Sequence, residues 1–441
     1  MPDLARSRPS HTPRHSHARR DRSAAGRRVA LVVVAVLAFG GSATAVAVSR
    51  LRGNVGTVGS LDGLIAAPTG SPTDLPATDL SAGRAVTFVM VGSDTRSGEN
   101  AAIGGEVDGM RADTTIVVHI AADRSRVDAV SIPRDSEASI PACHLDRDPA
   151  GRMSRPRTDK FNAAFSIGGS TGDVGLAAAC TMSTMAATTG LAVTEFALVD
   201  FAGFQGMVEA IGGIRVCVPT ALKDYKDNTE LDLAAGWHDL DGPQALDYVR
   251  ARYVTGSDGS DVQRIARQQD FIAAVVRKAL SADVLTSPVS LARFLDAGTR
   301  SLTMSDGLAA GLPGLAWGLR GIDPSTVTFV TVPWGSGTKG RIVLTDDATT
   351  LWERIAADEP ITGAVDAPVG GPVVEPTAGA AAAPAPVPAP TPAAVGSGAA
   401  PAPVPDGAAA AGAPALPAPV PGVTPRTGVD PDEALCGPSS S

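Results

Sequence analysis

Three short apolar runs decide the fold of this chain: VTFVMVG at residues 86–92, TIVVHI at 115–120 and VDAVSI at 127–132. Short runs rich in β-branched residues and bounded by Gly, Asp or Pro are typical of buried β-strands. Two later runs share this pattern, FALVD at 196–200 and VTFVTVP at 327–333. The sequence therefore predicts a buried sheet built from these segments.

Segments with helical periodicity lie between the predicted strands, at residues 173–188, 201–211, 244–249 and 261–280. In the last of them, apolar residues recur at close to one helical turn: Ile265, Ile272, Val275, Val276 and Leu280. Strands that alternate with helices favour an α/β fold, with helices on both faces of the sheet in a three-layer α/β/α sandwich.

The beginning of the chain has the charge pattern of a membrane protein. Residues 1–28 contain eight arginines and two aspartates, and we expect a basic cytoplasmic tail there. Residues 29–48 form an uncharged run of about the twenty residues that a helix needs to cross a bilayer. Because positive charge crowds the N-terminal side, we expect one transmembrane helix, a cytoplasmic N-terminus and an extracytoplasmic remainder. The alternative is a cleaved signal peptide, which usually has a shorter apolar core.

Composition divides the remainder into three parts. Residues 49–84 are rich in Gly, Ser, Thr and Pro, which indicates a linker. Residues 85–359 contain the predicted strands and helices and form one expected folded domain. Residues 360–441 include AAAAPAPVPAPTPAA and few charges, which is typical of a disordered tail. We interpret this tail as a spacer; the alternative is a structural protein in which the tail spans the wall and the globular part anchors it.

The four cysteines form an even set in a compartment that we expect to be oxidising: Cys143, Cys180, Cys217 and Cys436. Their spacing lacks the short paired intervals of a zinc site, so disulfides are the favoured interpretation. Four cysteines allow three connectivities, which all remain open, and we favour Cys143 with Cys180 and Cys217 with Cys436.

Arginine and aspartate occur together at the ends of three predicted strands. These pairs are Asp94 with Arg96, Arg111 with Asp113, and Arg134 with Asp135. Ligands of open α/β sheets bind just past the carboxyl ends of strands. A single Arg–Asp neighbour is more often a solvated surface pair, but three of them at strand ends favour a shared site.

The densest polar cluster is YVRARYVTGSDGSDVQRIARQQ at residues 248–269. Arg250 and Arg252 are two residues apart and share a face if this segment is extended. Arg264 and Gln268 are four residues apart and share a face of the predicted helix. Guanidinium groups near the start of a helix are suited to a polyanion such as a phosphate.

Carboxylates accompany the arginines. Asp94 and Asp113 offer the hard oxygen ligands that Mg²⁺ or Mn²⁺ prefer, and such ions usually keep substrate phosphates as further ligands. A metal ion with an arginine clamp is a usual means of stabilising charge in phosphoryl transfer. The sequence contains no Walker loop, nucleophile elbow or HExxH motif, and His119 is interpreted as a core or edge histidine.

Taken together, these motifs resemble the LytR-CpsA-Psr family of bacterial cell-wall ligases. The resemblance covers residues 87–271 and weakens towards Pro333. It is carried, in this order, by VMVGSDTR, RADTTIVVHI, AVSIPRDS, DKFNAAFSIGG, VDFAGFQGMVEAIGGIRVCVP, LDGPQALDYVRARY and QRIARQQ. It implies a metal-assisted phosphotransferase that moves a glycopolymer from a polyprenyl-pyrophosphate carrier to peptidoglycan or another cell-wall acceptor. A phosphodiester forms and polyprenyl phosphate is released. The resemblance also implies a hydrophobic lipid pocket, with pyrophosphatase activity as an additional expectation and no nucleic-acid partner.

The resemblance further implies roles for single residues. Asp94 and Asp113 match the residues nearest the metal. The residues that match pyrophosphate ligands are Arg111, Arg134, Lys160, Arg250, Arg252, Arg264 and Gln268. The expected catalytic residues are Arg111, Arg134 and Asp261, where Asp261 either orients the arginines or deprotonates the acceptor hydroxyl.

The sequence departs from the family pattern at four positions: Ala112, Glu137, Phe161 and Phe165. None of these departures removes a charged site residue. Glu137 stands where the family usually has an aromatic residue, and it either faces water or repels an anionic donor. The alternative function is a non-catalytic envelope protein that binds or senses polyprenyl pyrophosphate, and the paired carboxylates favour the enzyme.

Overall fold

The structure is a computed structural model that describes residues 49–50, 53–66, 83–94, 99–104, 109–226, 228–257, 259–281, 287–337, 341–361, 426–427 and 436. The predicted segments 1–28 and 29–48, Arg96 and most of residues 360–441 lie outside this description. Within the described ranges, no helix is both long enough and apolar enough to cross a bilayer. The boundaries of the membrane segment, the linker, the domain and the tail stay predictions.

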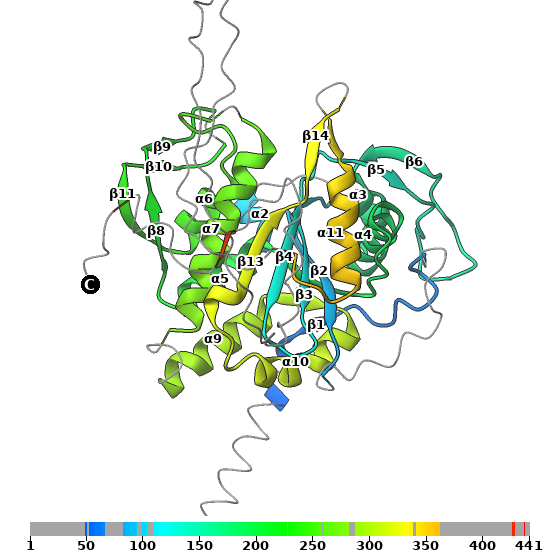
Figure 1. Ribbon diagram of the computed structural model, residues 1–441, viewed down its shortest axis with the longest axis horizontal. Helices are drawn as coiled ribbons and strands as arrows, with labels where there is room; N and C mark the ends of the chain where they lie inside the picture. The colour runs from blue at the N-terminus through cyan, green and yellow to red at the C-terminus, as the bar shows by residue number, and fades with distance from the viewer. Residues whose placement is uncertain are drawn as a thin grey trace, which may run out of the picture.

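A mixed β-sheet forms the centre of the molecule (Figure 1). Its strands are β1 Gly56–Thr57, β2 Val86–Ser93, β3 Ala112–Ile120, β4 Val127–Ile132, β7 Glu195–Val199, β12 Leu302–Met304, β13 Val327–Thr331 and β16 Arg426–Thr427. They lie in the order β1-β12-β7-β2-β3-β4-β13-β16. β3 is antiparallel to β2 and β4, whereas β7 is parallel to β2 and β13 is parallel to β4. The predicted α/β fold is confirmed.

The predicted strands are present, with small differences at their ends. β13 ends at Thr331 rather than at residue 333. Val332 still donates its N–H to the carbonyl of Ser131 at 3.0 Å, but Pro333 has no N–H to continue the ladder.

Side chains alternate along β2 and β3, which gives the sheet two apolar faces. Val89 and Val117 are buried in one cluster, and Ile116 and Val118 in another. Helices α3 (Ala163–Gly168), α4 (Val174–Thr189) and α11 (Asp346–Ala356) contribute to the first cluster. Helices α7 (Asp261–Ala279) and α10 (Asp306–Gly318) contribute to the second. Helices thus cover both faces of the sheet.

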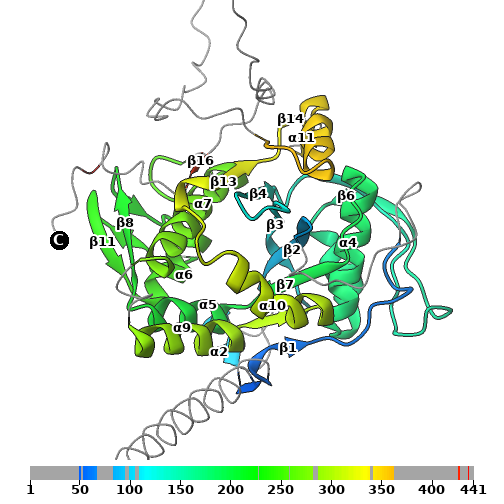
Figure 2. The ribbon, with the colours of Figure 1, turned by 60° about the horizontal axis from the view of Figure 1, so that its bottom comes forward.

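A third apolar cluster lies beside α7, where α5 (Phe201–Ala210) and α6 (Gly242–Arg250) pack against β8 (Ile214–Val218) and β11 (Gly236–Leu240) (Figure 2). The remaining elements are α2 Glu99–Gly104, β5 Glu137–Ile140, β6 Arg157–Lys160, η1 Gly169–Thr171, β9 Leu222–Lys223, β10 Asp232–Leu233, α9 Pro288–Arg300, η2 Pro324–Thr326, β14 Trp334–Ser336 and β15 Ile342–Leu344. The four predicted helices correspond to α4, α5, α6 and α7. Helix α6 begins two residues earlier than predicted, because Asp241 and Gln244 form a capping box.

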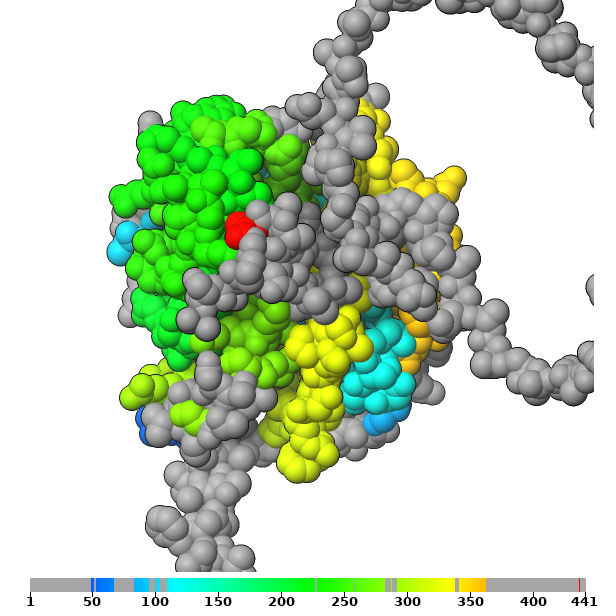
Figure 3. All heavy atoms as spheres, turned by 60° about the vertical axis from the view of Figure 1, so that its left-hand side comes forward, coloured from blue at the N-terminus to red at the C-terminus, as the bar shows by residue number. Residues whose placement is uncertain are grey.

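Two disulfides join distant parts of the chain, with the pairing that the sequence analysis favours. Cys143 is bonded to Cys180, and Cys217 on β8 is bonded to Cys436. The second bond brings the end of the described chain, red in Figure 3, against the green part of the molecule. β16 pairs antiparallel with β13 and so covers the edge of the sheet.

Candidate functional site

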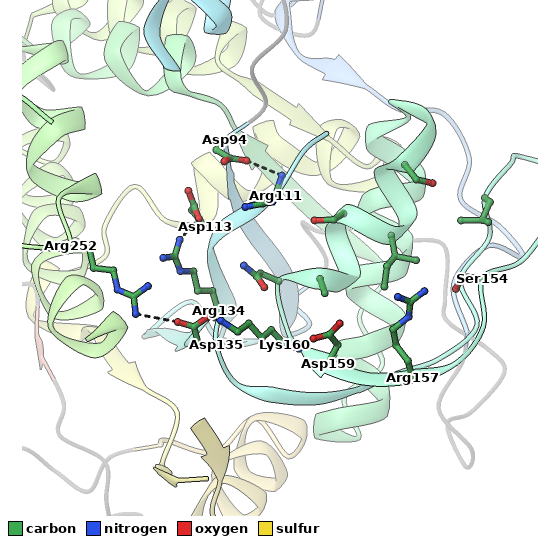
Figure 4. Close-up of a pocket in the computed structure, with 16 residues that line it drawn as sticks. Asp94, Arg111, Asp113, Arg134, Asp135, Ser154, Arg157, Asp159, Lys160 and Arg252 are labelled. Atoms are coloured by element: carbon green, nitrogen blue, oxygen red, sulfur yellow. Dashed lines mark hydrogen bonds and ion pairs between the residues drawn. The ribbon is translucent and has the colours of Figure 1, made fainter. Parts of the chain in front are cut away.

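The ends of β2, β3 and β4 meet at one edge of the sheet. Because β3 runs opposite to β2 and β4, the residues after β2 and β4 lie beside those that precede β3. Asp94, Arg111, Asp113 and Arg134 therefore come together, as expected from the three Arg–Asp pairs. They line one polar cavity of about 870 Å³ (Figure 4).

A β-bulge directs Asp113 into this cavity. Gly92 pairs with Thr114 and Ser93 pairs with Ala112, so Asp113 is the extra residue on β3. Bulges of this kind turn a side chain away from the regular alternation of a strand. Ala112 is buried in the core, whereas the side chain of Asp113 borders the cavity.

Arg134 is fixed by two carboxylates. Its Nη1 lies 2.5 Å from Oδ1 of Asp113, and its Nε lies 3.3 Å from Oδ1 of Asp261. Asp261 Oδ2 also accepts the backbone N–H of Arg134 at 3.1 Å. Burial alone would lower the pKa of Arg134, but Asp113 and Asp261 raise it above its usual value. The guanidinium is therefore charged and held in one orientation.

The first turns of α7 form a buried polar layer behind Arg134. Asp261 and Arg264 are 2% and 4% exposed, and their side chains lie 2.6 Å apart. Arg264 also donates to the carbonyl of Asp113 at 2.8 Å. Burial lowers the pKa of Arg264, and Asp261 opposes this effect. Gln268 donates to the carbonyl of Val249 at 3.0 Å.

Asp135 joins two further cations at the cavity wall. Its Oδ1 lies 2.6 Å from Nζ of Lys160, and its Oδ2 lies 3.4 Å from Nη2 of Arg252. Arg252 is also held by a hydrogen bond from its Nε to the carbonyl of Gly259 at 2.6 Å. Burial would raise the pKa of Asp135, but Lys160, Arg134 and Arg252 together lower it. Asp135 therefore holds Lys160 and Arg252 in place at the cavity wall.

An apolar cavity of about 540 Å³ adjoins the polar one. It lies between the sheet face that carries Met90 and Ile116 and the helices α5, α6, α7 and α9. Its apolar lining includes Phe201, Phe204, Leu246, Phe271, Val275 and Phe294. Asp113, Arg134 and Arg252 line both cavities, so they form the junction between a charged space and an apolar space.

The predicted site residues divide between these two spaces. Arg111 and Lys160 border the polar cavity, and Arg250, Arg264 and Gln268 border the apolar one. Asp261 borders neither cavity and acts on them through Arg134 and Arg264. The roles expected for all these residues stay predictions.

The expectation that Arg250 and Arg252 share an extended face is wrong. Arg250 is the last residue of α6, and its guanidinium stacks 4.3 Å from the ring centre of Phe201. Arg252 follows after the helix ends and reaches Asp135 instead. The two arginines therefore face different parts of the site.

Sequence reasoning missed a group of polar residues that extends the polar cavity: Ser154, Arg157, Asp159, Asn162, Ser166 and Ser170. The segment RPRTDKFN, residues 155–162, carried a signal in its closely spaced charges, but only Lys160 was singled out.

Two side chains that the sequence left ambiguous have clear partners. Oε2 of Glu137 lies 3.7 Å from Nη1 of Arg341, so its charge is paired rather than directed at an anion. His119 is 1% exposed and contacts Thr87 at 2.8 Å and Asp358 at 2.9 Å. The interpretation of His119 as a core histidine is confirmed.

The donor set at the polar cavity is compatible with a metal ion shared with a phosphate ligand. Among the described residues, no group of three or more His, Cys, Asp or Glu side chains is close enough to hold a metal alone. Asp94 and Asp113 nevertheless border the same cavity. Mg²⁺ is commonly held by one or two carboxylates with waters and substrate phosphates, and this pair fits that pattern.

A comparison with family models matches residues 66–355 to the LytR_cpsA_psr family. This chain belongs to the LytR-CpsA-Psr family. It is 30% identical to the cell wall biosynthesis protein LcpA of Corynebacterium glutamicum, over 60% of this chain and 54% of that protein. It is also 30% identical to the polyisoprenyl-teichoic acid–peptidoglycan teichoic acid transferase TagU of Enterococcus faecalis, over 40% of this chain and 50% of that protein.

The chain thus spans about half the length of these two LytR-CpsA-Psr relatives. Among solved structures, it is similar to the LytR-Csp2A-Psr enzyme from Actinomyces oris, with 23% identity and a TM-score of 0.47. That match covers 66% of this chain and 93% of the other.

Proposed function

We propose that this chain transfers a glycopolymer from a polyprenyl-pyrophosphate carrier to peptidoglycan or another cell-wall acceptor. One observation carries the proposal: Asp113, Arg134 and Arg252 border both a polar cavity and an apolar cavity. A ligand that fills both spaces needs an anionic head directly joined to an apolar tail. A lipid pyrophosphate has this chemistry, and the names of the LcpA and TagU relatives refer to cell-wall synthesis and polyisoprenyl-linked transfer.

In this proposal the arginines bind the two phosphates at the junction. Each guanidinium can hold phosphate oxygens with two parallel hydrogen bonds. No ion pair joins the guanidinium of Arg111 to any described residue, so it can pair with the ligand. Arg134 is already oriented by Asp113 and Asp261, so it need not reorient as charge develops on the leaving phosphate.

Asp261 serves here as a positioning residue rather than as the base. Its carboxylate is 2% exposed, contacts Arg134 and Arg264, and borders neither cavity. An acceptor hydroxyl therefore has no direct access to it. Of the two roles that the family resemblance implies for Asp261, this geometry supports orientation of the arginines.

The reaction is an attack of an acceptor hydroxyl on the distal phosphorus of the carrier. The new phosphodiester bond forms as the bond from that phosphorus to the bridging oxygen breaks, and polyprenyl phosphate leaves. The hydroxyl proton passes to a carboxylate of the cavity wall. If water takes the place of the acceptor, the same step becomes pyrophosphate hydrolysis.

Asp94 and Asp113 would hold Mg²⁺ or Mn²⁺ together with the phosphates, and a bound ion would neutralise charge on the phosphate oxygens. Asp94→Asn is the cleaner test because Asp113 also fixes Arg134. We expect Asp94→Asn to raise the Mg²⁺ concentration for half-maximal activity on the order of tenfold, with recovery at high Mg²⁺. Full activity of the unaltered protein in excess chelator would contradict this role.

The apolar cavity would hold the polyprenyl tail. Val275→Trp fills part of it, and loss of contact with about two methylene groups at about 0.8 kcal/mol each weakens binding about tenfold. We therefore expect the KM of a long-chain undecaprenyl donor to rise by this factor. A donor with a short chain that does not reach Val275 should be much less affected. An equal change for both donors would count against the assignment.

The decisive test of the proposed function is turnover by the purified protein. The assay mixes a synthetic polyprenyl-pyrophosphate saccharide, soluble peptidoglycan fragments and Mg²⁺, and follows polyprenyl phosphate and the phosphodiester product by mass spectrometry. We expect both products to accumulate. Tight donor binding without either product, in Mg²⁺ or Mn²⁺, would make the chain a binding or sensing protein instead.

We further propose that residues 29–48 anchor the chain in the cytoplasmic membrane with the catalytic domain outside. This location gives access to both a membrane-embedded carrier and the cell wall. The two disulfides support it, because such bonds persist mainly in oxidising extracytoplasmic compartments.

A further inference from the structure

The polar cavity continues past Lys160 into a region that a diphosphate does not need. We call this region the β6 arm, and define it by Ser154, Arg157, Asp159, Asn162, Ser166 and Ser170. In Figure 4, Arg134 and Lys160 lie between Arg252 at one side and Arg157 at the other. A cavity of about 870 Å³ is large enough for sugar residues as well as a diphosphate, since pockets for whole small molecules span about 300–1,000 Å³.

The β6 arm has the polar groups that a charged saccharide requires. No hydrogen bond or ion pair joins the guanidinium of Arg157 to any residue that the structure describes, and this residue is exposed towards the cavity. Ser166 on α3 and Ser170 on η1 add hydroxyl groups that can donate and accept hydrogen bonds. The carboxylate of Asp159 lies 3.5 Å from Nη2 of Arg341 and is paired with it. The arm therefore combines one available cation, one paired carboxylate and neutral groups suited to sugar hydroxyls.

The walls of the β6 arm are fixed. Ser154 donates its N–H to the carbonyl of Cys143 at 2.8 Å, and its Oγ accepts the N–H of Cys143 at 3.0 Å. Cys143 is in turn bonded to Cys180 on α4. On the other wall, α3 approaches α4 so closely that a Cβ at Gly168 would lie 2.2 Å from the carbonyl oxygen of Leu176. These contacts hold the arm in one shape before a ligand binds.

The β6 arm is also joined to the catalytic junction. Asn162 donates its backbone N–H to the carbonyl of Arg134 at 3.2 Å. Lys160, at the end of β6, pairs with Asp135, which directly follows Arg134. A ligand in the arm therefore lies next to the groups proposed to bind the diphosphate.

The geometry of phosphoryl transfer determines which substrate this arm faces. The attacking oxygen and the leaving oxygen lie roughly in line on opposite sides of the phosphorus. In the proposed binding mode the polyprenyl tail fills the apolar cavity, so the leaving lipid phosphate would lie on that side of the junction, near Arg252. The attacking hydroxyl must then approach from the opposite side of the junction, where the β6 arm lies.

We propose that the β6 arm binds the acceptor, and that the acceptor is a hydroxyl-rich saccharide with an anionic group that pairs with Arg157. This inference rests on the transferase function proposed above and assigns the second substrate within it. The acceptor hydroxyl forms the new bond to the distal phosphorus, the lipid phosphate leaves on the far side, and the hydroxyl proton passes to a carboxylate of the cavity wall.

The test compares Arg157→Gln with Arg155→Gln in the full-length protein. Arg155 is exposed, lies two residues away and borders no part of the cavity, so it is a matched control. The acceptor is a soluble peptidoglycan fragment with a free carboxylate, used beside the same fragment with that carboxylate amidated. Initial rates of phosphodiester formation are measured while acceptor and donor concentrations are varied separately.

We expect Arg157→Gln to raise the acceptor KM by about tenfold or more, the effect of losing one charge-assisted hydrogen bond. Donor KM should stay within about twofold, and Arg155→Gln should match the unaltered protein. With the amidated fragment, the unaltered protein should show the same raised KM as Arg157→Gln.

Two results would overturn the inference. An unchanged acceptor KM in Arg157→Gln would remove Arg157 from acceptor binding. An equal rise in donor KM would mean that the arm binds the glycopolymer of the donor instead of the acceptor. Failure of the transferase function itself has a different signature, because the unaltered protein would then form no phosphodiester and release no lipid phosphate.

Discussion

Replacement of Arg134 with Ala should lower the rate of polyprenyl phosphate release by about a thousandfold. Arg134 is the guanidinium at the junction of the two cavities, and it is the only group that contacts both Asp113 and Asp261 within the described ion pairs. Its removal takes away a phosphate ligand, leaves Asp113 without its ion-pair partner and leaves Asp261 paired with Arg264 alone. The negative charge of these carboxylates then weakens binding of the anionic donor. Single-turnover kinetics with a radiolabelled donor measure the effect.

A control is needed because loss of a paired arginine can also destabilise the fold. Arg147 pairs with Asp173 at 2.6 Å but lies outside both cavities, so Arg147→Ala removes a comparable ion pair away from the site. We expect Arg147→Ala to retain activity. Arg134→Lys keeps the charge but not the planar fork, and we expect a partial loss. Retention of more than about a tenth of the rate in a folded Arg134→Ala protein would reject a transition-state role.

The second large effect concerns stability. Removal of the Cys143–Cys180 bond should lower the free energy of unfolding by about 4 kcal/mol, because the bond closes a loop with a sequence separation of 37 residues and restricts the unfolded chain. Both cysteines are buried against α3 and α4. Chemical denaturation of a Cys143→Ala, Cys180→Ala double variant, followed by circular dichroism, gives the difference.

Two comparisons separate the cross-link from side-chain effects. Reduction of a protein that lacks Cys217 and Cys436 breaks only the first bond without changing its side chains. Reduction of the complementary protein, which lacks Cys143 and Cys180, measures the contribution of the Cys217–Cys436 bond to stability. If the midpoint of unfolding is the same before and after reduction of the first bond, then the loop it closes is already ordered without it.

Much of the sheet and its site could be predicted because the relevant signals are local. The β-branched runs at 86–92, 115–120 and 127–132 specify strands, and charged residues directly at their ends must lie at sheet edges. The order of strands and charged residues along the chain was therefore enough to predict that these side chains lie together: Asp94, Arg111, Asp113 and Arg134. The predicted helix ends were less accurate where a capping residue determines the first residue of the helix, as Asp241 does for α6.

The features that escaped prediction depend on contacts between distant segments. The bulge that turns Asp113 into the cavity depends on how β2 and β3 are paired, and that register is not visible in either strand alone. The burial of Asp261 depends on how α7 packs against Arg134. Arg157 was missed because its place at the cavity follows from the pairing of β5 with β6 and from the bond between Cys143 and Cys180.

The attachment of β16 and Cys436 limits how far the Pro/Ala-rich segment can extend. Ile361 lies in the core of the domain, and the chain is joined to the domain again where Arg426 pairs with β13 and where Cys436 is bonded to Cys217. Whatever path residues 362–425 take, no point on them can be farther from the domain than about half their fully stretched length. Used as a spacer, this segment would span half the distance of a segment attached at one end only. A single proteolytic cut within it would leave both pieces attached to the domain.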